Sequence, residues 1–248
     1  MAEQAVLYET AGGIAKIAIN RPEKRNALSE EVCAGLADAW RRFAKSDERV
    51  AILYGVGDRA FCAGADMRDP PKEMWKSMPG IVADLDKPVI AAIEGYCIGA
   101  GYALPMLCDI VVAGETATFS YPEPQVGASG GVIAGLAARI PHKIAMEFML
   151  LGKTISAQRA YEVGMINKVT PAGGAMAGAM EYAEAFLTTA PLVVSMLKRM
   201  VYDTVTPRSG PETMARMRRE VLVVAESEDR LEGRAAFREK RKPVFKGK

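Results

Sequence analysis

Two glycine-rich segments contain the residues of this chain that are best suited to chemistry. Gly99-Ala100-Gly101 opens a run compatible with a helix, after an apolar segment over 89–93 and a turn at Gly95. Upstream, residues 61–66 have the sequence Phe-Cys-Ala-Gly-Ala-Asp and follow an apolar segment over 50–54. N–H groups at a helix start are unpaired, and the helix dipole places positive charge there. Two such turns could direct two backbone N–H groups at one oxygen, as an oxyanion hole requires, or they are simply tight turns that glycine permits.

Composition limits the kinds of protein that this chain can be. The chain has 248 residues, of which 50% are hydrophobic and 25% are charged, enough for a sizeable core. Its formal net charge of +2 lacks the basic excess of a nucleic-acid binder, so we expect no nucleic-acid partner. No apolar run reaches about eighteen residues and no leader sequence is evident, so we expect no membrane association and a place in the cytoplasm. The four cysteines lack metal-ligand spacing and are expected to be buried free thiols, with no metal site.

The pattern of apolar residues predicts an α/β fold. The helix that begins after Ser29 has apolar residues at helical spacing, and strand-like segments alternate with helices as in right-handed βαβ units. Residues 67–84 include Pro70-Pro71 and scattered methionines, and we expect a mobile flap over the site or a poorly ordered helix there. The expected strands cover residues 6–10, 15–20, 50–54, 89–93, 110–113 and 166–169.

The chain after residue 190 is expected to form helices without strand partners. Apolar residues recur at helical spacing on two of these helices. They are Val193, Met196, Leu197 and Met200 on the first, and Met214, Met217, Val221 and Val224 on the second. An apolar face of this kind must be covered by the core or by another subunit. We therefore separate a C-terminal helical segment, residues 191–248, from residues 1–190.

A series of short motifs runs in order along nearly the whole chain. They lie at residues 20–28, 60–66, 87–101, 108–110, 120–123, 155–158 and 236–245. In order and spacing these motifs resemble the crotonase superfamily, the group of enoyl-CoA hydratases and isomerases. The resemblance implies an α/β fold with a crotonase-like ββα spiral over 1–190 and a helical C-terminal trimerisation segment over 191–248. It also implies a homotrimer, or a dimer of such trimers.

The resemblance implies an acyl thioester of coenzyme A as the substrate, with no further cofactor and no metal. The matching positions for the two backbone N–H donors to the thioester oxygen are Ala65 and Ala100. Two fixed donors stabilise the enolate that forms when a proton leaves or joins the neighbouring carbon, and losing one costs ~3–4 kcal/mol of transition-state stabilisation. Glu123, in a loop between two prolines, matches the family's catalytic acid or base. A carboxylate in an apolar pocket would have a raised pKa and could carry protons.

Two features depart from the family pattern. Ala103 stands where family hydratases have a second glutamate, and the loop at 127–131 is shorter than theirs. Hydration needs one group to take a proton from water and another to protonate carbon, whereas moving a double bond needs a single carboxylate. The missing glutamate therefore shifts the expectation from hydration of an enoyl-CoA toward its isomerisation. Decarboxylation or hydrolysis of an acyl-CoA, and hydration by one glutamate, remain alternatives.

The resemblance also implies contacts to coenzyme A from both ends of the chain. Near the N-terminus, the matching residues are Lys24 and Arg25 for the phosphates, and Ala27, Ala63 and Asp66, whose backbone would cradle the adenine and pantetheine. Near the C-terminus they are Phe237 and Lys240, which in the family commonly come from a neighbouring subunit. Without the resemblance, the basic residues would be assigned to a solvated turn and a solvated tail.

Other patterns in the sequence point to other classes of protein. Residues 127–131 match the G-x-S-x-G motif of serine hydrolases, but the only histidine is His142 and no acidic residue lies between it and Ser129. Gly99-Ala100-Gly101 begins like a dinucleotide-binding motif, but Leu104 replaces the third glycine. A catalytically inactive acyl-CoA-binding protein on the same fold remains open, because the second glutamate is missing.

Overall fold

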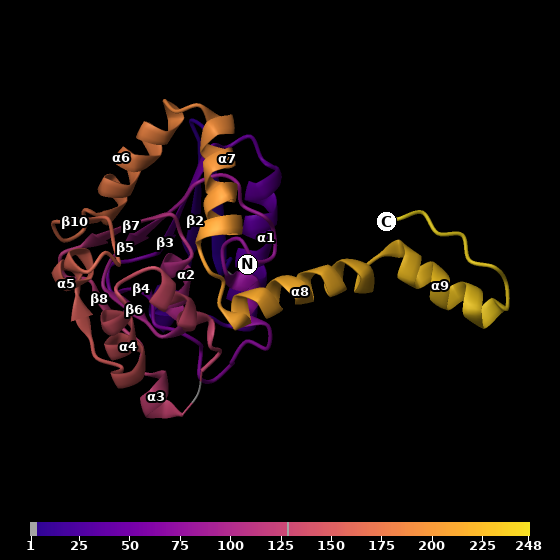
Figure 1. Cartoon of the computed structure of the whole chain (residues 1–248), viewed down its shortest axis with the longest axis horizontal. Helices are drawn as coiled ribbons and strands as arrows, with labels where there is room; N and C mark the ends of the chain where they lie inside the picture. The colour runs from indigo at the N-terminus through magenta and orange to yellow at the C-terminus, as the bar shows by residue number, and fades with distance from the viewer. Residues whose placement is uncertain (1–3, 128) are drawn as a thin grey trace.

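Two β-sheets form the core of the computed structural model, which describes residues 4–127 and 129–248. Within this part of the chain, the larger sheet has six strands in the order β1-β2-β3-β5-β7-β10 (Figure 1). β1 and β2 pair as an antiparallel hairpin, and the other neighbours are parallel. The strands are β1 (Val6–Ala11), β2 (Ile14–Ile19), β3 (Val50–Gly55), β5 (Val89–Ile93), β7 (Ile110–Gly114) and β10 (Lys168–Thr170). The apolar runs predicted each of them, although β10 begins two residues later than expected.

The smaller sheet has the order β4-β6-β8-β9, and its first three strands are parallel. They are β4 (Ala60–Cys62), β6 (Tyr96–Ile98) and β8 (Thr118–Ser120), joined by the antiparallel β9 (Ile155–Ser156). β4, β6 and β8 each come next in the chain after a strand of the larger sheet, and a helix follows β6 and β8. This repeated passage from strand to strand to helix confirms the predicted ββα spiral. The sequence pattern predicted none of the four strands of this sheet, because β4, β6 and β8 have only three residues each and β9 has two.

Helices cover both faces of the larger sheet (Figure 1). α1 (Glu30–Lys45) begins at its predicted cap, where the Ser29 hydroxyl accepts a hydrogen bond from the Val32 N–H at 3.4 Å. α6 (Ala175–Leu187) packs its alanines on the alternate strand residues, which face the opposite side of the sheet. Apart from η2 (Met74–Ser77), the other helical segments of the described residues before the C-terminal region are η1 (Pro22–Lys24), α2 (Ala100–Met106), α3 (Glu123–Val126), η3 (Val132–Ala138), α4 (His142–Leu151) and α5 (Ala157–Glu162).

The segment at residues 67–84 does not form the expected flap. Its short 3-10 helix η2 (Met74–Ser77) lies against α1, and the Trp40 indole N–H donates to the Ser77 carbonyl at 2.7 Å. The apolar residues that follow η2 are buried in the core: Met78, Ile81, Val82 and Leu85. Of the two alternatives expected for this segment, the free flap is wrong from residue 74 onward, because contacts with distant parts of the chain hold it in place. The helix is present only as the four residues of η2.

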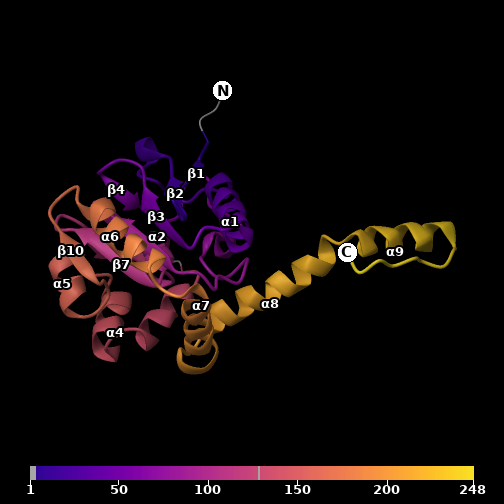
Figure 2. The same ribbon diagram turned by 90° about the horizontal axis from the view of Figure 1, so that it is seen from above.

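The C-terminal helices divide into one that lies on the body and two that leave it. α7 (Pro191–Met200) is held to the body by Lys198, whose ammonium group contacts the Asp109 carboxylate at 2.6 Å. After the π-helical turn η4 (Val201–Val205), α8 (Gly210–Ala225) and α9 (Glu228–Glu239) extend away from the body (Figures 1 and 2). We call residues 210–248 the arm. The projecting part of the chain thus begins at α8 rather than at residue 191.

Two further expectations can be compared with the described residues. Over 4–127 and 129–248, no helix combines the length and the hydropathy that a membrane span needs. The four cysteines all lie in this part of the chain and are buried free thiols, as predicted.

Candidate active site

The residues expected at the reacting centre follow the ends of neighbouring strands in the smaller sheet. Because β4, β6 and β8 are parallel, their carboxyl ends meet at one edge, where open α/β sheets bind ligands. Ala65 follows β4, Ala100 follows β6 as the first residue of α2, and Glu123 follows β8 as the first residue of α3. The chain topology therefore brings all three to one edge, although they lie far apart in the sequence.

The turns that hold Ala65 and Ala100 touch each other. Gly64 has φ +93°, and a Cβ there would lie 3.0 Å from the Ile98 carbonyl oxygen and 3.7 Å from the Ala100 nitrogen, so this approach needs glycine. In the part of the chain that the structure describes, no backbone carbonyl accepts a hydrogen bond from the Ala65 N–H or the Ala100 N–H. Neither N–H is therefore committed to a backbone partner, although the Ala100 N–H also interacts with the Glu123 carboxyl group.

Glu123 lies beside these turns and is held in a short helix rather than in the expected loop. Its carboxyl packs directly against Gly99, where any added Cβ would collide with Oε1. Among the described residues, its buried Oε2 has no hydrogen-bond partner. Burial raises the pKa of Glu123 to about 7, and the N–H groups of Glu123 itself and of Ala100 oppose the shift only in part. Such a group can both give and take a proton near neutral pH.

Ala103 leaves this side of the site without a second carboxylate. It lies one helical turn after Ala100 on α2, on the same face, and is 3% exposed. The adjacent Tyr102 packs edge-on against Phe119 and Phe148, with ring centroids 5.8 and 5.3 Å apart, so its ring belongs to the core. Among the positions predicted for the reacting centre, only Glu123 carries a carboxyl group.

The serine-hydrolase interpretation of residues 127–131 does not hold. The Ser129 hydroxyl is hydrogen-bonded to the Tyr121 hydroxyl at 2.7 Å, and residue 128 of the motif lies outside the described residues. His142 begins α4 and is exposed, and no hydrogen bond within the described segments joins it to Ser129. A nucleophile without its base cannot act as a hydrolase triad.

Most of the N-terminal residues expected to contact coenzyme A lie together next to this site. The loop at 21–28 runs alongside residues 63–66, because the Ala63 N–H donates to the Arg25 carbonyl at 3.0 Å. Lys24 and Arg25 are exposed, so their charges are free to meet an anion. This pairing places four of the predicted residues at one edge: Lys24, Arg25, Ala27 and Ala63.

The Asp66 side chain stabilises the same edge of the site, where the loop at 21–28 meets residues 63–66. Its carboxylate accepts hydrogen bonds from the Arg68 N–H at 3.0 Å and from the Arg21 guanidinium at 3.1 Å. These contacts, the Arg68 N–H first, lower the pKa of Asp66. Arg21 also donates to the Ala27 carbonyl at 3.0 Å, so it ties the two segments together. The sequence analysis assigned no role to Arg21, although it lies within the 20–28 motif. The Asp66 N–H donates to the Leu28 carbonyl at 2.8 Å, so it also joins the two segments.

Comparisons with known proteins place the chain in a family. A family model described as enoyl-CoA hydratase/isomerase matches residues 9–248. The chain belongs to this family. A carnitinyl-CoA dehydratase of Proteus mirabilis is 36% identical over 262 residues, which cover 99% of this chain and 99% of that protein. An (E)-benzylidenesuccinyl-CoA hydratase of Thauera aromatica is 33% identical over 256 residues, covering 98% and 99%. The crystal structure of a carnitinyl-CoA hydratase from Mycobacterium avium has a TM-score of 0.78 at 34% identity, with 100% of both chains covered.

Within one chain of this family member, the two C-terminal residues assigned to coenzyme A are not brought to the site. Phe237 lies on α9 and is 85% exposed, and Lys240 ends that helix. α9 forms the far part of the arm, well away from β4, β6 and β8 (Figure 1). The predicted contacts of Phe237 and Lys240 therefore need the arm of a second copy, and they remain a prediction.

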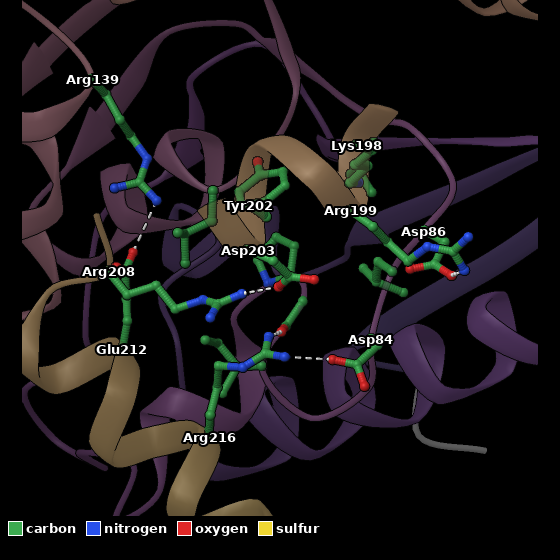
Figure 3. A pocket seen from close by; sticks show the side chains of 16 residues that line it. Asp84, Asp86, Arg139, Lys198, Arg199, Tyr202, Asp203, Arg208, Glu212 and Arg216 are labelled. Atoms are coloured by element: carbon green, nitrogen blue, oxygen red, sulfur yellow. Dashed lines mark hydrogen bonds and ion pairs between the residues drawn. The ribbon is translucent and has the colours of Figure 1, made fainter. Parts of the chain in front are cut away.

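A cavity of about 330 Å³ lies elsewhere, where α7 and α8 meet the body (Figure 3). Ala65, Ala100 and Glu123 are not among the residues that line it. Its walls carry ion pairs, Arg139–Glu212 at 3.0 Å, Arg216–Asp84 at 2.7 Å, Arg208–Asp203 at 2.7 Å and Arg199–Asp86 at 2.9 Å. Because these cations already have carboxylate partners, we assign the cavity to the junction between arm and body.

In the described segments, no group of three or more His, Cys, Asp and Glu side chains could hold a metal ion.

Proposed function

We propose that this protein adds water to the C2–C3 double bond of an enoyl-CoA thioester, and removes it in the reverse direction. The N–H groups of Ala65 and Ala100 donate to the thioester carbonyl oxygen, and Glu123 carries each proton that moves. The placement of the Glu123 carboxyl against Gly99, next to the Ala100 N–H, is the observation that carries this proposal.

One carboxyl group can act as base and as acid in turn. As the water oxygen bonds to C3, ionised Glu123 takes one proton from the water, and the double-bond electrons move onto the thioester oxygen to form an enolate. The two N–H donors stabilise this charge, each by roughly 3–4 kcal/mol in the transition state. Protonated Glu123 then gives its proton to C2. The product has gained one water molecule, and Glu123 is ionised again.

The pKa of Glu123 suits this double role. With a pKa of about 7, the carboxyl group is partly ionised and partly protonated near neutral pH. Neither proton transfer then starts from a rare form of the enzyme, which is the condition for efficient acid–base catalysis. Because burial is the main cause of the raised pKa, the site must keep bulk solvent away from Glu123 while it admits the one water molecule that reacts.

The names of two relatives support hydration in particular. One is a carnitinyl-CoA dehydratase and the other an (E)-benzylidenesuccinyl-CoA hydratase, at 36% and 33% identity over nearly the whole chain. A dehydratase and a hydratase catalyse the same reaction in opposite directions. We therefore place hydration and dehydration first.

Ala103 favours isomerisation as a second candidate. Without a second carboxylate on this face of α2, Glu123 could take a proton from C2 of a 3-enoyl-CoA and return it to C4. A dienolate forms in this case, and the same two N–H groups stabilise the charge on its thioester oxygen, but no water is added. The two reactions differ in their products and can be separated by one experiment.

The test is a panel of CoA thioesters followed by mass spectrometry, with 2-enoyl, 3-enoyl, 3-hydroxyacyl and malonyl-type substrates. We expect the 2-enoyl thioester to gain the mass of one water, and the 3-hydroxyacyl thioester to lose it. A 3-enoyl thioester converted without change in mass would favour isomerisation instead. Loss of carbon dioxide or release of free CoA would favour the decarboxylase or hydrolase alternative. Binding of CoA without any conversion would contradict an enzymatic function and favour an inactive acyl-CoA-binding protein.

We also propose that the functional unit is a homotrimer, or a dimer of trimers, in which the arm of one copy completes the site of another. The arm exposes large apolar side chains that a stable surface in water seldom leaves uncovered, such as Met217 at 65% and Val224 at 68%. Phe237 and Lys240 lie on this arm and not at the site of their own chain. An exchange of arms would cover the apolar faces and bring both residues to a bound coenzyme A.

A further inference from the structure

A hydrogen bond between two hydroxyl groups spans the turn that carries Glu123. The Tyr121 hydroxyl lies 2.7 Å from the Ser129 Oγ. Tyr121 comes directly after β8 and before Glu123, whereas Ser129 lies beyond the end of α3. The bond therefore joins the two ends of the segment that presents the carboxyl group.

The surroundings of the two hydroxyls indicate which of them donates. Tyr121 is 5% exposed, and in the described part of the chain its hydroxyl has no other hydrogen-bond partner. If Ser129 donated, the buried phenol proton would be left unpaired, which costs free energy. Ser129 is exposed, and its Oγ also accepts a hydrogen bond from the Gly131 N–H at 3.0 Å. Tyr121 is therefore the donor, and Ser129 uses both of its acceptor positions inside the loop.

The rest of the turn is anchored on its other side. The Gln125 side chain donates to the Leu151 carbonyl at 3.0 Å, at the end of α4. The Gly99 N–H donates to the Ser120 carbonyl at 2.8 Å, which fixes the start of the turn beside the oxyanion donors. The Tyr121–Ser129 bond is the contact that closes the remaining end.

We propose that Tyr121 and Ser129 are positioning residues for Glu123, and that their hydrogen bond keeps the turn closed so that the carboxyl group stays against Gly99 and out of bulk solvent. This inference rests on the proposed function, because it gives Glu123 its catalytic meaning. It also explains why residues 127–131 contain a serine in a G-x-S-x-G pattern without a histidine base. The serine acts as an acceptor for tyrosine rather than as a nucleophile.

The electrostatic surroundings agree with this role. Burial is the largest cause that raises the pKa of Tyr121, and the Glu123 charge raises it further, so the phenol and the carboxyl group are near each other. Burial and two backbone N–H groups set the pKa of Glu123, and no charged side chain in the described segments contributes. Loss of the closing bond would let water reach Glu123 and lower its pKa toward the ordinary value of 4.5.

The test uses the variants Tyr121→Phe, Ser129→Ala and the double variant in the full-length protein. Carbon-13 NMR of labelled glutamate carboxyl groups, with Glu123→Gln to assign the signal, measures the pKa of Glu123 without any need for turnover. We expect this pKa to fall in both single variants, and the double variant to resemble either single one, because the two residues act through one bond. Ser129→Thr keeps the hydroxyl and should keep the wild-type value. Tyr161→Phe, at a half-exposed tyrosine on α5, is the matched control.

Turnover gives the second readout. On whichever CoA thioester the wild-type enzyme converts, kcat should fall about tenfold in each single variant while KM changes little, since a misplaced catalytic group costs rate and leaves binding intact. An unchanged Glu123 pKa in both single variants, or losses that multiply in the double variant, would overturn the inference. If the wild-type protein converts no thioester, the proposed function fails, and the NMR titration still decides whether the pair positions Glu123.

Discussion

Replacing Gly99 by alanine tests the geometry of the site through the backbone. Gly99 has φ +58° and ψ −127°, a conformation that side chains strongly disfavour. The new Cβ would collide with Glu123 Oε1 and lie 3.1 Å from the carboxyl carbon, where ordinary contacts begin at 3.4 Å. The carboxyl group must then move by about 1 Å, and a displacement of this size costs up to about 10²-fold in rate.

Gly12→Ala is the matched control for this change. Gly12 also has φ +58°, but a Cβ there would meet nothing within 4 Å. Each substitution strains the backbone by about 1–3 kcal/mol, and each kcal/mol lowers Tm by about 2–4 °C in a chain of this size. Circular dichroism should show a loss of thermal stability in both variants, but only Gly99→Ala should lose about 10²-fold in kcat. A wild-type kcat in Gly99→Ala, or an equal loss in Gly12→Ala, would refute the assigned position of Glu123.

Ala103→Glu should raise the ratio of hydration to isomerisation, because it places a second carboxyl group on the face of α2 that carries Ala100. Product analysis by mass spectrometry measures this ratio. An unchanged ratio would argue against the role assigned to position 103. The pKa of Glu123 in the folded protein, about 7, lies above its ordinary value of 4.5. Between these two pH values the folded state binds more protons than the unfolded state, so the stability of the fold falls as pH rises from 4.5 through 7. In Glu123→Gln this part of the fall in Tm should disappear, and superimposable curves of Tm against pH for the two proteins would contradict the raised pKa. Met217 and Val221 lie on an exposed apolar face of α8 and are 65% and 67% exposed. Replacing both by aspartate puts charge on this face, which should weaken the contact between copies and reduce the mass of the assembly measured by light scattering. A wild-type protein that is already monomeric would contradict the proposed trimer.

The strands could be predicted where their own residues are enough to define them. Residues 89–93 are Val-Ile-Ala-Ala-Ile, and β5 has the same bounds. The segment at 67–84 could not be predicted in this way, because its order depends on partners elsewhere in the chain. The hydrogen bond from Trp40 to Ser77 spans 37 positions, and no local pattern indicates it.

The same distinction between local sequence and distant contacts applies to the residues of the candidate site. The turns at Ala65 and Ala100 are marked in the sequence by glycines, because a close approach of two backbones requires them. Glu123 could not be distinguished from a surface glutamate without the family resemblance, since its raised pKa comes from burial in the folded chain. The Arg21–Asp66 pair joins residues 45 positions apart and becomes visible only when the two loops lie side by side.

The central claim is that Glu123 carries the protons of the reaction beside a backbone oxyanion hole. Glu123→Gln tests it most directly, because the amide keeps the shape of the side chain but cannot take up and release a proton. On the thioester that the wild-type enzyme converts, kcat should fall by about 10²–10⁴-fold, the usual cost of losing an acid–base group. Calorimetry should show an unchanged affinity for CoA. A Glu123→Gln protein that binds CoA normally and turns over at nearly the wild-type rate would contradict the claim.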